Sequence, residues 1–462
     1  MFTISFSDDK PLYEQLYTYI REQIEMGNIC SGEKLPSKRM LSAHLKISVV
    51  TVETAYSLLA AEGYIYSKPG SGYYAENLPG AFRKRKTDKP ILSTAHSKRE
   101  FSIDFSTNRV DTTLFPFSIW AKLSREILSS GGKELLSTCS GKGVLALRQA
   151  IGDYLRDYRG MDVHPEQIIV GAGSEYLTGL LIQLLGRDMC YGVEDPGYVK
   201  THLVFSANCT SVLPIEVDGS GARLDSLVSL GIQIAHITPS HHFPLGTVMP
   251  AARRHEMLSW AYSAPDRYII EDDYDSDFRL YGKPVPTLQS LDCSSHVVYL
   301  NTFTKSLAPS MRIGYMVIPP DLLDRFEEKL GFYACTVPVF DQLILTEFIK
   351  RGYFERHISR MRKLYISRRN YFIDSLKKSP LSNILDIKGA DAGMHLLLRS
   401  KNGMREAELI KMAADEDVRV YGLSEYYSFG TNKDEGRIIV GYSGMSTQEI
   451  SRGISALERA WL

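Results

Sequence analysis

The chain has few cysteines, and they form no metal-binding or disulfide pattern. Its 462 residues include six cysteines, which are scattered along the sequence without any C-x-x-C pair. Zinc sites and disulfide frameworks need cysteines at short, regular spacing, so we expect neither, and we predict no metal site. Scattered cysteines are typical of a reducing compartment, and the sequence therefore predicts a cytoplasmic protein.

The chain also lacks long apolar runs and an excess of charge of either sign. No apolar stretch is long enough to cross a bilayer, and the polar, acidic N-terminus is unlike a signal peptide, so no membrane association is expected. Lysine and arginine number 54, as do aspartate and glutamate, which gives a formal net charge of zero. Any binding to nucleic acid must therefore depend on a local patch. No solenoid-type repeat is visible.

What is present is enough sequence for two or three domains. The length exceeds that of one ordinary domain, and 44% of the residues are hydrophobic, which allows a large buried core. The pattern changes near Phe101, where alternating helices and apolar strands begin. We therefore predict domains at residues 1–77 and 101–462, joined by a linker at residues 78–100.

The N-terminal segment is predicted to form three helices and a β-hairpin. Apolar residues at helical spacing predict helices over residues 11–26, 38–45 and 49–62, with Ser37 and Ser48 as caps of the last two. Short aromatic stretches on both sides of the turn at residues 68–71 predict the hairpin. Three helices followed by a hairpin form a winged helix-turn-helix, whose third helix is of the size that enters a major groove.

The motifs of this segment resemble the GntR-type winged helix over nearly all of residues 10–76. They are P-L-Y-E-Q-L, L-P-S-K-R-M-L-S, T-V-E-T-A-Y-S-L-L-A-A-E-G-Y-I and K-P-G-S-G. The resemblance implies that promoter DNA is the partner, and that the DNA-binding residues are Ser37, Lys38, Arg39, Ser48, Thr51, Lys68 and Gly70. The chain departs from the family where Val49 and Val50 follow Ser48, because the family usually has an arginine there. A winged helix that makes only protein contacts is the alternative.

The predicted DNA-binding module carries little positive charge. Residues 1–80 contain seven lysines and arginines against nine aspartates and glutamates. Because phosphate contacts supply most of the affinity for DNA, we expect weak binding by one module and tighter binding by a dimer. The linker is basic, with Arg83–Lys86, Lys89, Lys98 and Arg99. It is either a solvated tether or an additional source of attraction for phosphates.

From Phe101 onward, one apolar strand after another is followed by a polar or aromatic cluster. The predicted strands are residues 167–170, 190–193, 233–237, 268–270 and 296–300, and the predicted helices include residues 145–158 and 175–185. A parallel α/β sheet brings such clusters together at its carboxyl edge. We therefore predict an α/β domain with a mainly parallel sheet and a ligand site at that edge.

The stretch Asn301–Gly314 (N-T-F-T-K-S-L-A-P-S-M-R-I-G) holds the central residue of the predicted site, Lys305. A lysine buried just after a strand loses solvation, so its pKa falls and its neutral amine becomes a nucleophile toward an aldehyde. The nearby threonines and Arg312 are donors that suit a phosphate. An amine beside phosphate-binding groups indicates pyridoxal 5'-phosphate (PLP) held by Lys305 as a Schiff base. A surface lysine in a polar loop is the alternative.

The other groups that PLP requires occur at the ends of neighbouring strands. Asp272 can keep the pyridine nitrogen protonated, Tyr274 can donate to the phenolic oxygen, and Tyr198 can stack on the ring. The backbone at Ser174 and Glu175, together with Thr302 or Thr304 and Arg312, can bind the phosphate.

Residues 101–462 resemble a fold-type-I aminotransferase. The motifs V-E-D-P-G-Y, T-P-S-H-H-F-P-L-G, E-D-D-Y-D-S-D-F and T-F-T-K-S-L-A-P-S-M-R-I-G-Y match that family in order. With the winged helix, the chain is similar to the MocR/GabR subfamily of GntR regulators, and the resemblance implies the same PLP-binding roles. It also implies that Arg437 binds an effector carboxylate, with Arg399 as the alternative, and that His242 belongs to the effector pocket.

Three departures from aminotransferases indicate a sensor with an effector pocket of altered shape. Glu175 and Tyr176 replace a usual pair of glutamines, His242 replaces the glutamine of H-Q-F-P, and residues 137–143 lack a tyrosine common in these enzymes. A glutamate beside a phosphate repels it unless the side chain is turned away.

We therefore expect a PLP-dependent transcriptional regulator with no physiological turnover. It would be a homodimer, associated with the nucleoid when bound to DNA, and would sense PLP itself or a small amino compound. Its DNA target would be two half-sites or direct repeats. The alternatives are an active aminotransferase with an accessory DNA-binding domain and a scaffold without cofactor.

Overall fold

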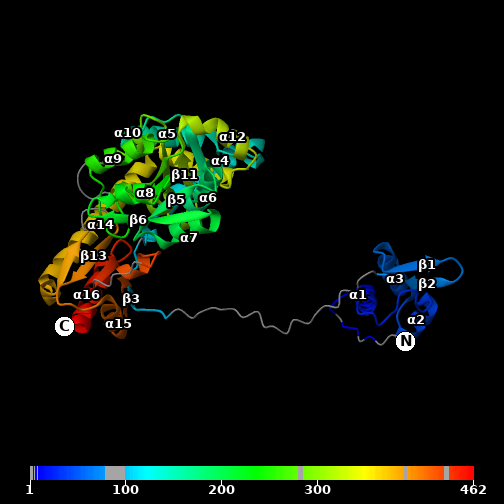
Figure 1. The fold of residues 1–462 in the computed structure, drawn as a ribbon. Coiled ribbons are helices and arrows are strands. Elements are labelled where there is room, and N and C mark those ends of the chain that lie inside the picture. The colour runs from blue at the N-terminus through cyan, green and yellow to red at the C-terminus, as the bar shows by residue number, and fades with distance from the viewer. Residues whose placement is uncertain are drawn as a thin grey trace. The chain divides into compact units, whose positions relative to one another are not determined.

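The computed structural model describes residues 4, 6, 7, 9–78, 99–107, 109–278, 285–389, 393–430 and 436–462. Residue contacts divide the chain into two compact units, Met1–Lys98 and Arg99–Leu462 (Figure 1). Most of the basic segment predicted as a linker, including Arg83–Lys86, lies outside the described residues, and the predicted ranges 1–77, 78–100 and 101–462 stay predictions.

The N-terminal unit is a winged helix-turn-helix, as predicted. It contains α1 (Leu12–Glu25), α2 (Lys38–Leu45), α3 (Val49–Ala61), β1 (Ile65–Lys68) and β2 (Gly72–Ala75). The strands β1 and β2 pair antiparallel to form the wing. The apolar faces of the three helices meet in one core, which includes Leu16, Ile20, Val52, Tyr56 and Leu59. This unit therefore buries a core of its own.

The larger unit is built around an eight-stranded sheet with the order β4-β11-β10-β9-β8-β5-β6-β7. The strands are β4 (Ile168–Gly171), β5 (Cys190–Asp195), β6 (Ser211–Asp218), β7 (Gly221–Ala222), β8 (Ile234–Ile237), β9 (Tyr268–Asp272), β10 (Val297–Thr302) and β11 (Gly314–Val317). The five central strands, from β10 to β6, are mutually parallel, while β4, β11 and β7 pair antiparallel. The predicted mainly parallel sheet is confirmed.

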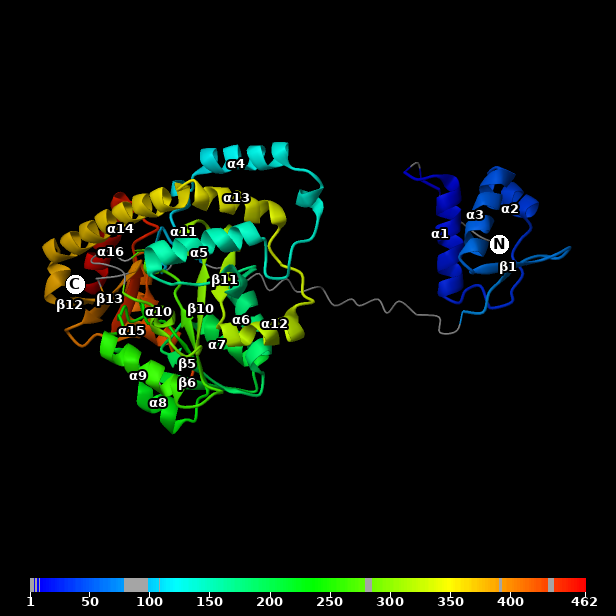
Figure 2. The same ribbon diagram turned by 90° about the horizontal axis from the view of Figure 1, so that it is seen from above.

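Helices cover both faces of this sheet. They are α4 (Phe117–Ser130), α5 (Leu145–Arg159), α6 (Ser174–Leu185), α7 (Val199–Asn208), α8 (Leu224–Ser229), α9 (Ala251–Tyr262), α10 (Leu288–Leu291), α11 (Phe303–Ser306), α12 (Leu323–Leu330), α13 (Val339–Lys350) and α14 (Tyr353–Lys378). Two neighbouring residues of β10 show which helices cover which face of the sheet. Val298 packs with α6, α7 and α12 on one face, and Tyr299 packs with α5 and α13 on the other. Figure 2 shows α13 beside α5 and α14, with α4 lying outside them.

A second, four-stranded sheet follows in the order β12-β13-β16-β15. Its elements are β12 (Leu385–Lys388), β13 (His395–Ser400), β15 (Tyr421–Gly422) and β16 (Arg437–Gly441), and α15 (Glu406–Asp415) and α16 (Thr447–Trp461) accompany them. A short parallel pair joins β3 (Ile103–Asp104) to β14 (Val418–Arg419). Single 3-10 turns occupy Thr112–Leu114, Lys133–Leu136, Pro165–Gln167, Ser276–Phe278, Pro309–Met311, Pro320–Leu322, Pro380–Asn383 and Leu423–Tyr426.

The loop that follows β8 and the turn that follows β12 meet at a close contact between glycines. A Cβ atom on Gly246 would lie 2.8 Å from the Cα atom of Gly389, and both glycines have positive φ. Nearby, the His395 ring in β13 contacts the carbonyl oxygen of Pro244 through Nε2 at 3.0 Å. The segment that follows β8 is thus held against the C-terminal sheet by backbone contacts that leave no room for a methyl group.

Within the part of the chain that the structure describes, no helix combines the length and the apolar character needed to span a bilayer.

Candidate functional site

The carboxyl ends of β9 and β10 and the start of α6 surround a cavity of about 450 Å³. Asp272 is the last residue of β9, Thr302 is the last of β10, and Ser174 is the first of α6. All nine residues predicted to bind PLP line this cavity: Lys305, Asp272, Tyr274, Tyr198, Ser174, Glu175, Thr302, Thr304 and Arg312. The sheet therefore brings together residues that are up to 138 positions apart in sequence, from Ser174 to Arg312.

Lys305 lies in α11, the single helical turn that follows β10. Its side chain is partly buried, and burial lowers the pKa of its amine to about 8, although the Asp275 carboxylate acts in the opposite direction. At pH 7, a pKa of about 8 leaves about one amine in ten unprotonated, against about one in a few thousand for an ordinary lysine. The lysine is therefore suited to react with an aldehyde.

Asp272 forms an acidic wall of the cavity, with a histidine beside it. The Nε2 atom of His236, from the neighbouring strand β8, lies 3.5 Å from Oδ2 of Asp272. The His236 ring is buried and packs edge-on against Phe205 at 5.4 Å between ring centres. Sequence reasoning missed His236, although a histidine inside an otherwise apolar buried strand was a usable signal.

The start of α6 and Arg312 form a wall of the cavity whose N–H groups can bind an anion. Gly173, with φ of +92°, precedes α6, whose first N–H groups have no partner within the helix. The Nη2 atom of Arg312 donates to the carbonyl oxygen of Ala172 and to Oε2 of Glu175, both at 3.3 Å. Thr302 Oγ1 accepts a hydrogen bond from the backbone N–H of Thr304 at 3.3 Å.

Glu175 does not stand against this wall as an isolated negative charge. Its carboxylate forms ion pairs with Lys200 and with Arg312, and the hydrogen bond from Lys200 is the main reason that its pKa is lowered. The repulsion expected between Glu175 and a phosphate is thereby offset by two cations. Lys200, two residues after Tyr198, also lines the cavity and was missed in the sequence.

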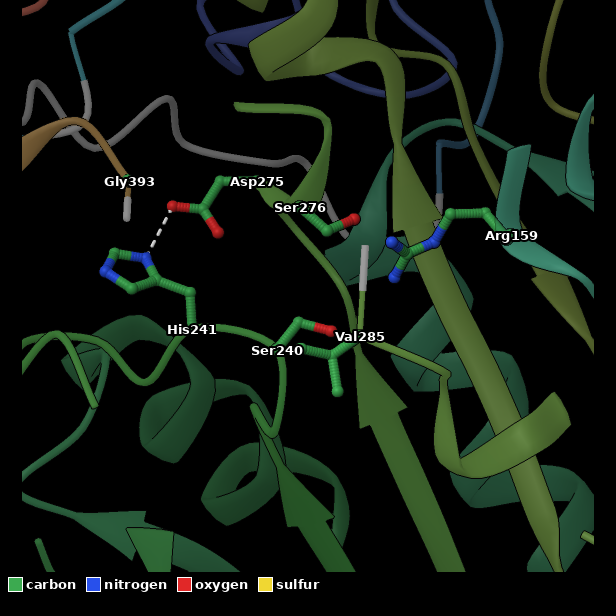
Figure 3. Close-up of a pocket in the computed structure, with 7 residues that line it drawn as sticks. All are labelled: Arg159, Ser240, His241, Asp275, Ser276, Val285 and Gly393. Atoms are coloured by element: carbon green, nitrogen blue, oxygen red, sulfur yellow. Dashed lines mark hydrogen bonds and ion pairs between the residues drawn. The ribbon is translucent and has the colours of Figure 1, made fainter. Parts of the chain in front are cut away.

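Tyr274 belongs to a buried group of polar side chains. Its hydroxyl lies 3.1 Å from Nδ1 of His241, and the same nitrogen lies 2.8 Å from Oδ2 of Asp275. Figure 3 shows His241 facing Asp275, with Gly393 close to the same edge of the ring and Arg159 separated from them. Burial raises the pKa of Tyr274 well above its ordinary value, so its hydroxyl is a hydrogen-bond donor at neutral pH. His241, which fixes this hydroxyl, was missed as well.

Arg159, which lines the same small pocket as His241 and Asp275, forms a buried ion pair. Its Nη2 atom lies 2.6 Å from Oδ2 of Asp273, and both side chains are almost fully buried. The same carboxylate oxygen accepts a hydrogen bond from Tyr299 at 2.6 Å, in the middle of β10. Breaking a buried pair of this kind strongly destabilises a protein, so Arg159 and Asp273 support the strand ends that carry the cavity residues.

Aromatic rings line another part of the cavity. Tyr198 is 53% exposed, and its ring meets Phe243 edge-on at 5.9 Å between ring centres. Phe243 in turn meets Tyr426 at 5.0 Å, and all three residues line the cavity. The exposed ring of Tyr198 leaves a face on which a planar ligand can stack.

The predicted effector residues do not line the cavity. Arg437 begins β16 and is paired in register with Arg399 of β13, so the two arginines lie side by side on the C-terminal sheet. His242 is buried, and burial lowers its pKa to about 3. Its Nε2 atom lies 3.7 Å from the carboxyl of Glu194, which does line the cavity and whose own pKa burial raises to about 8. The roles given to Arg437 and His242 stay predictions.

The predicted DNA-binding residues lie at three places in the N-terminal unit. Ser37, Lys38 and Arg39 open α2, Ser48 and Thr51 open α3, and Lys68 and Gly70 belong to the wing. Ser37 and Ser48 cap their helices, because their hydroxyl oxygens accept hydrogen bonds from the N–H groups of Met40 at 3.3 Å and Thr51 at 3.0 Å. Lys68 Nζ lies 4.7 Å from the ring centre of Tyr74, and Arg39 is exposed.

Comparisons with known proteins agree with both units. Residues 102–457 match the family Aminotransferase class I and II, and residues 12–74 match the bacterial regulatory proteins of the gntR family. The chain is 40% identical to the uncharacterized HTH-type transcriptional regulator YdeL of Bacillus subtilis, over 98% of this chain and 97% of that protein. It is 33% identical to the probable rhizopine catabolism regulatory protein MocR of Rhizobium meliloti, over 100% of this chain and 96% of that protein.

The fold of the larger unit is that of solved aminotransferases. The kynurenine aminotransferase of Pyrococcus horikoshii superposes with a TM-score of 0.69, covering 79% of this chain and 91% of that chain at 24% identity. The class is therefore that of a GntR winged helix joined to an aminotransferase-like domain. The chain belongs to the MocR/GabR subfamily of GntR-type transcriptional regulators. The prediction of a transcriptional regulator is confirmed.

Proposed function

We propose that this regulator binds PLP covalently at Lys305 and that occupancy of the same cavity by PLP or a small amino compound controls its binding to promoter DNA. The observation that carries the proposal is the single cavity lined by all nine residues that PLP would require. Its reactive amine, its carboxylate wall and its anion-binding wall are separate parts of one surface. They match the aldehyde, the pyridine nitrogen and the phosphate of PLP.

Each residue has a physical task in this proposal. Bound PLP would supply an electrophilic carbon, with which the amine of Lys305 or that of an effector could react. The Asp272 carboxylate, held by His236, would keep a proton on the ring nitrogen, and Tyr274 would donate its hydrogen to the phenolic oxygen. Arg312 and the N-terminus of α6 would bind the phosphate, with Thr302 as a further donor.

A homodimer is part of the proposal. Two large apolar side chains of the larger unit are strongly exposed, Leu136 at 84% and Phe332 at 79%. The segments that carry Leu136 and Phe332 meet where Gly141 packs against the backbone of Tyr333. Because monomeric proteins rarely expose such apolar groups together, a second copy of the chain is the proposed partner. Sedimentation should give a dimer that Phe332→Ser weakens and Val228→Ser, a change at an exposed residue of α8, does not.

The cofactor is tested by adding PLP to the purified full-length chain. The expected result is a new near-visible absorbance band, and a borohydride-stable adduct located by peptide mass mapping at Lys305. Lys305→Ala should abolish the adduct, while Lys363→Ala, which changes an exposed lysine of α14, should leave it unchanged. An adduct spread over many surface lysines would contradict the proposal.

Control of DNA binding is tested by measuring promoter affinity with and without PLP and amino compounds. PLP or one of the amino compounds should change the affinity at least about five-fold in the wild-type chain, within the usual range of coupling between sites, and should have no effect in Lys305→Ala. Steady conversion of an amino acid and a keto acid at ordinary enzyme rates would instead favour an active aminotransferase with an accessory DNA-binding domain. In the cell, the proposed location is the cytoplasm, at the nucleoid when DNA is bound.

A further inference from the structure

Helix α3 presents two apolar side chains to solvent at its N-terminal end. The helix buries Val52, Ala55, Tyr56 and Leu59 against the core, and the opposite side is open. Val50 is 69% exposed and Val49 is 41% exposed. Because these two valines lie on the outer side of the helix, their methyl groups are available for contacts outside the unit.

Helix α3 lacks the long polar side chains that usually read bases. Its thirteen residues, VVTVETAYSLLAA, include no lysine, arginine, asparagine, glutamine or histidine. Arginine and lysine are the usual partners of guanine in the major groove, and asparagine and glutamine are those of adenine. Direct readout by α3 is therefore restricted to hydroxyl groups, one carboxylate and methyl groups.

Several of the polar groups in the first half of α3 are already engaged within the N-terminal unit. The Thr54 hydroxyl donates to the carbonyl oxygen of Val50 at 2.9 Å. The Ser48 hydroxyl caps the helix and lies 2.8 Å from Oγ1 of Thr51. Glu53 is paired with Lys38 at 2.6 Å, which also reduces its repulsion of DNA phosphates. The valine methyl groups are thus the most available contacts at this end of the helix.

We infer that Val49 and Val50 read the C5-methyl groups of thymine, so that each half-site carries A·T pairs where it faces the start of α3. The inference rests on the DNA binding of the proposed function and adds the sequence that is read. Thymine is the only base whose major-groove edge carries a methyl group, and apolar side chains are its natural contact. The exposed Arg39 and Lys68 would hold the phosphates on either side, which positions the helix without selecting a sequence.

Selection from a randomised DNA library with the full-length chain tests the inference. The expected result is a site with thymine at one or two fixed positions per half-site. Replacing those thymines by uracil, which removes only the methyl group, should weaken binding about four-fold per methyl, the value of one buried methyl group. Val50→Ala should weaken binding to the thymine site by a similar factor and make the uracil substitution silent at the thymine that Val50 contacts.

The double substitution separates a direct contact from an indirect effect. If Val50 touches the thymine methyl, the effects of Val50→Ala and of uracil should not add. Leu58→Ala is the matched control, because Leu58 is a partly exposed apolar residue at the other end of α3, and it should leave the uracil effect at its wild-type size. Val50 is exposed, so Val50→Ala should leave the thermal stability of the unit unchanged.

The outcomes distinguish this inference from the proposed function. Recovery of no preferred sequence at all would overturn DNA-binding regulation itself. Recovery of a specific site in which uracil replaces thymine without loss, or in which Val50→Ala keeps the full uracil effect at every thymine, would overturn the readout by valine while leaving the regulator intact.

Discussion

Lys305 has an amine whose protonation changes near neutral pH. With a pKa lowered to about 8 by burial, its neutral fraction rises roughly ten-fold from pH 6 to pH 7 and then levels off above about pH 8. The rate at which PLP is captured by the chain should follow that curve in stopped-flow absorbance. An ordinary lysine would give a rate that still rises at pH 10, and this result would contradict the burial effect.

Glu194 gives a second pH dependence, that of the stability of the folded chain, which falls as pH rises. Burial raises its pKa from 4.5 to about 8, so the folded chain holds a proton there that the unfolded chain releases between these values. The free energy of unfolding therefore falls as pH rises from about 4.5 to about 8. Glu194→Gln removes this loss of stability, because a glutamine side chain has no carboxyl group to titrate. The hydrogen bonds are kept, since the amide oxygen can still accept from the N–H and hydroxyl groups of Thr238.

The measurement for Glu194 is the melting temperature without PLP at several pH values. Relative to wild type, the melting temperature of Glu194→Gln should rise between pH 5 and pH 8 by about 4 °C. The pKa difference amounts to ~3 kcal/mol over that range, and the melting temperature of a unit of about 360 residues changes by about 1.3 °C per kcal/mol. Glu328→Gln, at an exposed position of α12, should track wild type at every pH. A constant difference between Glu194→Gln and wild type would show that Glu194 is ionised in the folded chain.

The sequence predicted the cavity residues that follow strands, and it missed those that act through a neighbour. Lys305 and Asp272 were accessible because each lies at or just past the end of an apolar strand. His236 and His241 act on Asp272 and Tyr274 from another strand and another loop, and such pairings depend on strand order, which one sequence does not reveal. The pairing of Arg437 with Arg399 in the C-terminal sheet was inaccessible for the same reason.

At the scale of elements, helix ends were predicted within a residue or two because caps and glycines mark them locally. Ser48 and Gly63 bracket α3, for example. The strand β11 was not predicted, although it enters the large sheet between β4 and β10. Its antiparallel pairing with β4 joins segments that are distant in sequence, and no local pattern reveals such a pairing.

The start of α6 allows a sharp test of the anion-binding wall. A Cβ atom added to Gly173 would lie 3.1 Å from Nη2 of Arg312, and the φ of +92° disfavours any residue with a side chain. Gly173→Ala should therefore displace Arg312 and lower the affinity for PLP about ten-fold or more, measured by absorbance titration.

Gly179→Ala is the matched control for that substitution. Gly179 lies in the same helix, and a Cβ atom there meets nothing within 4 Å. Alanine is the better helix former, so Gly179→Ala should keep PLP affinity and stabilise the unit by roughly 0.5–1 kcal/mol. Equal PLP affinity in both variants would remove Arg312 and the α6 turn from the proposed phosphate site.

At the scale of the whole molecule, the two units have separate cores. The core of the N-terminal unit contains residues from Leu16 to Ala75, and those of the larger unit begin at Ile103. We therefore expect two transitions when the full chain is heated in a calorimeter. Leu16→Ala should lower the melting temperature of only one transition, because replacing a buried leucine costs ~2–5 kcal/mol of unfolding free energy. Leu181→Ala should lower the melting temperature of only the other. A single transition that both substitutions shift together would show that the units unfold as one.

The crossing of Gly246 and Gly389 has a mechanical consequence. Neither backbone has room for a methyl group at this contact, so the loop after β8 and the turn after β12 cannot shift independently of each other. Phe243 belongs to the same loop as Gly246 and lines the cavity. A ligand that displaced this loop would therefore also displace the start of the C-terminal sheet.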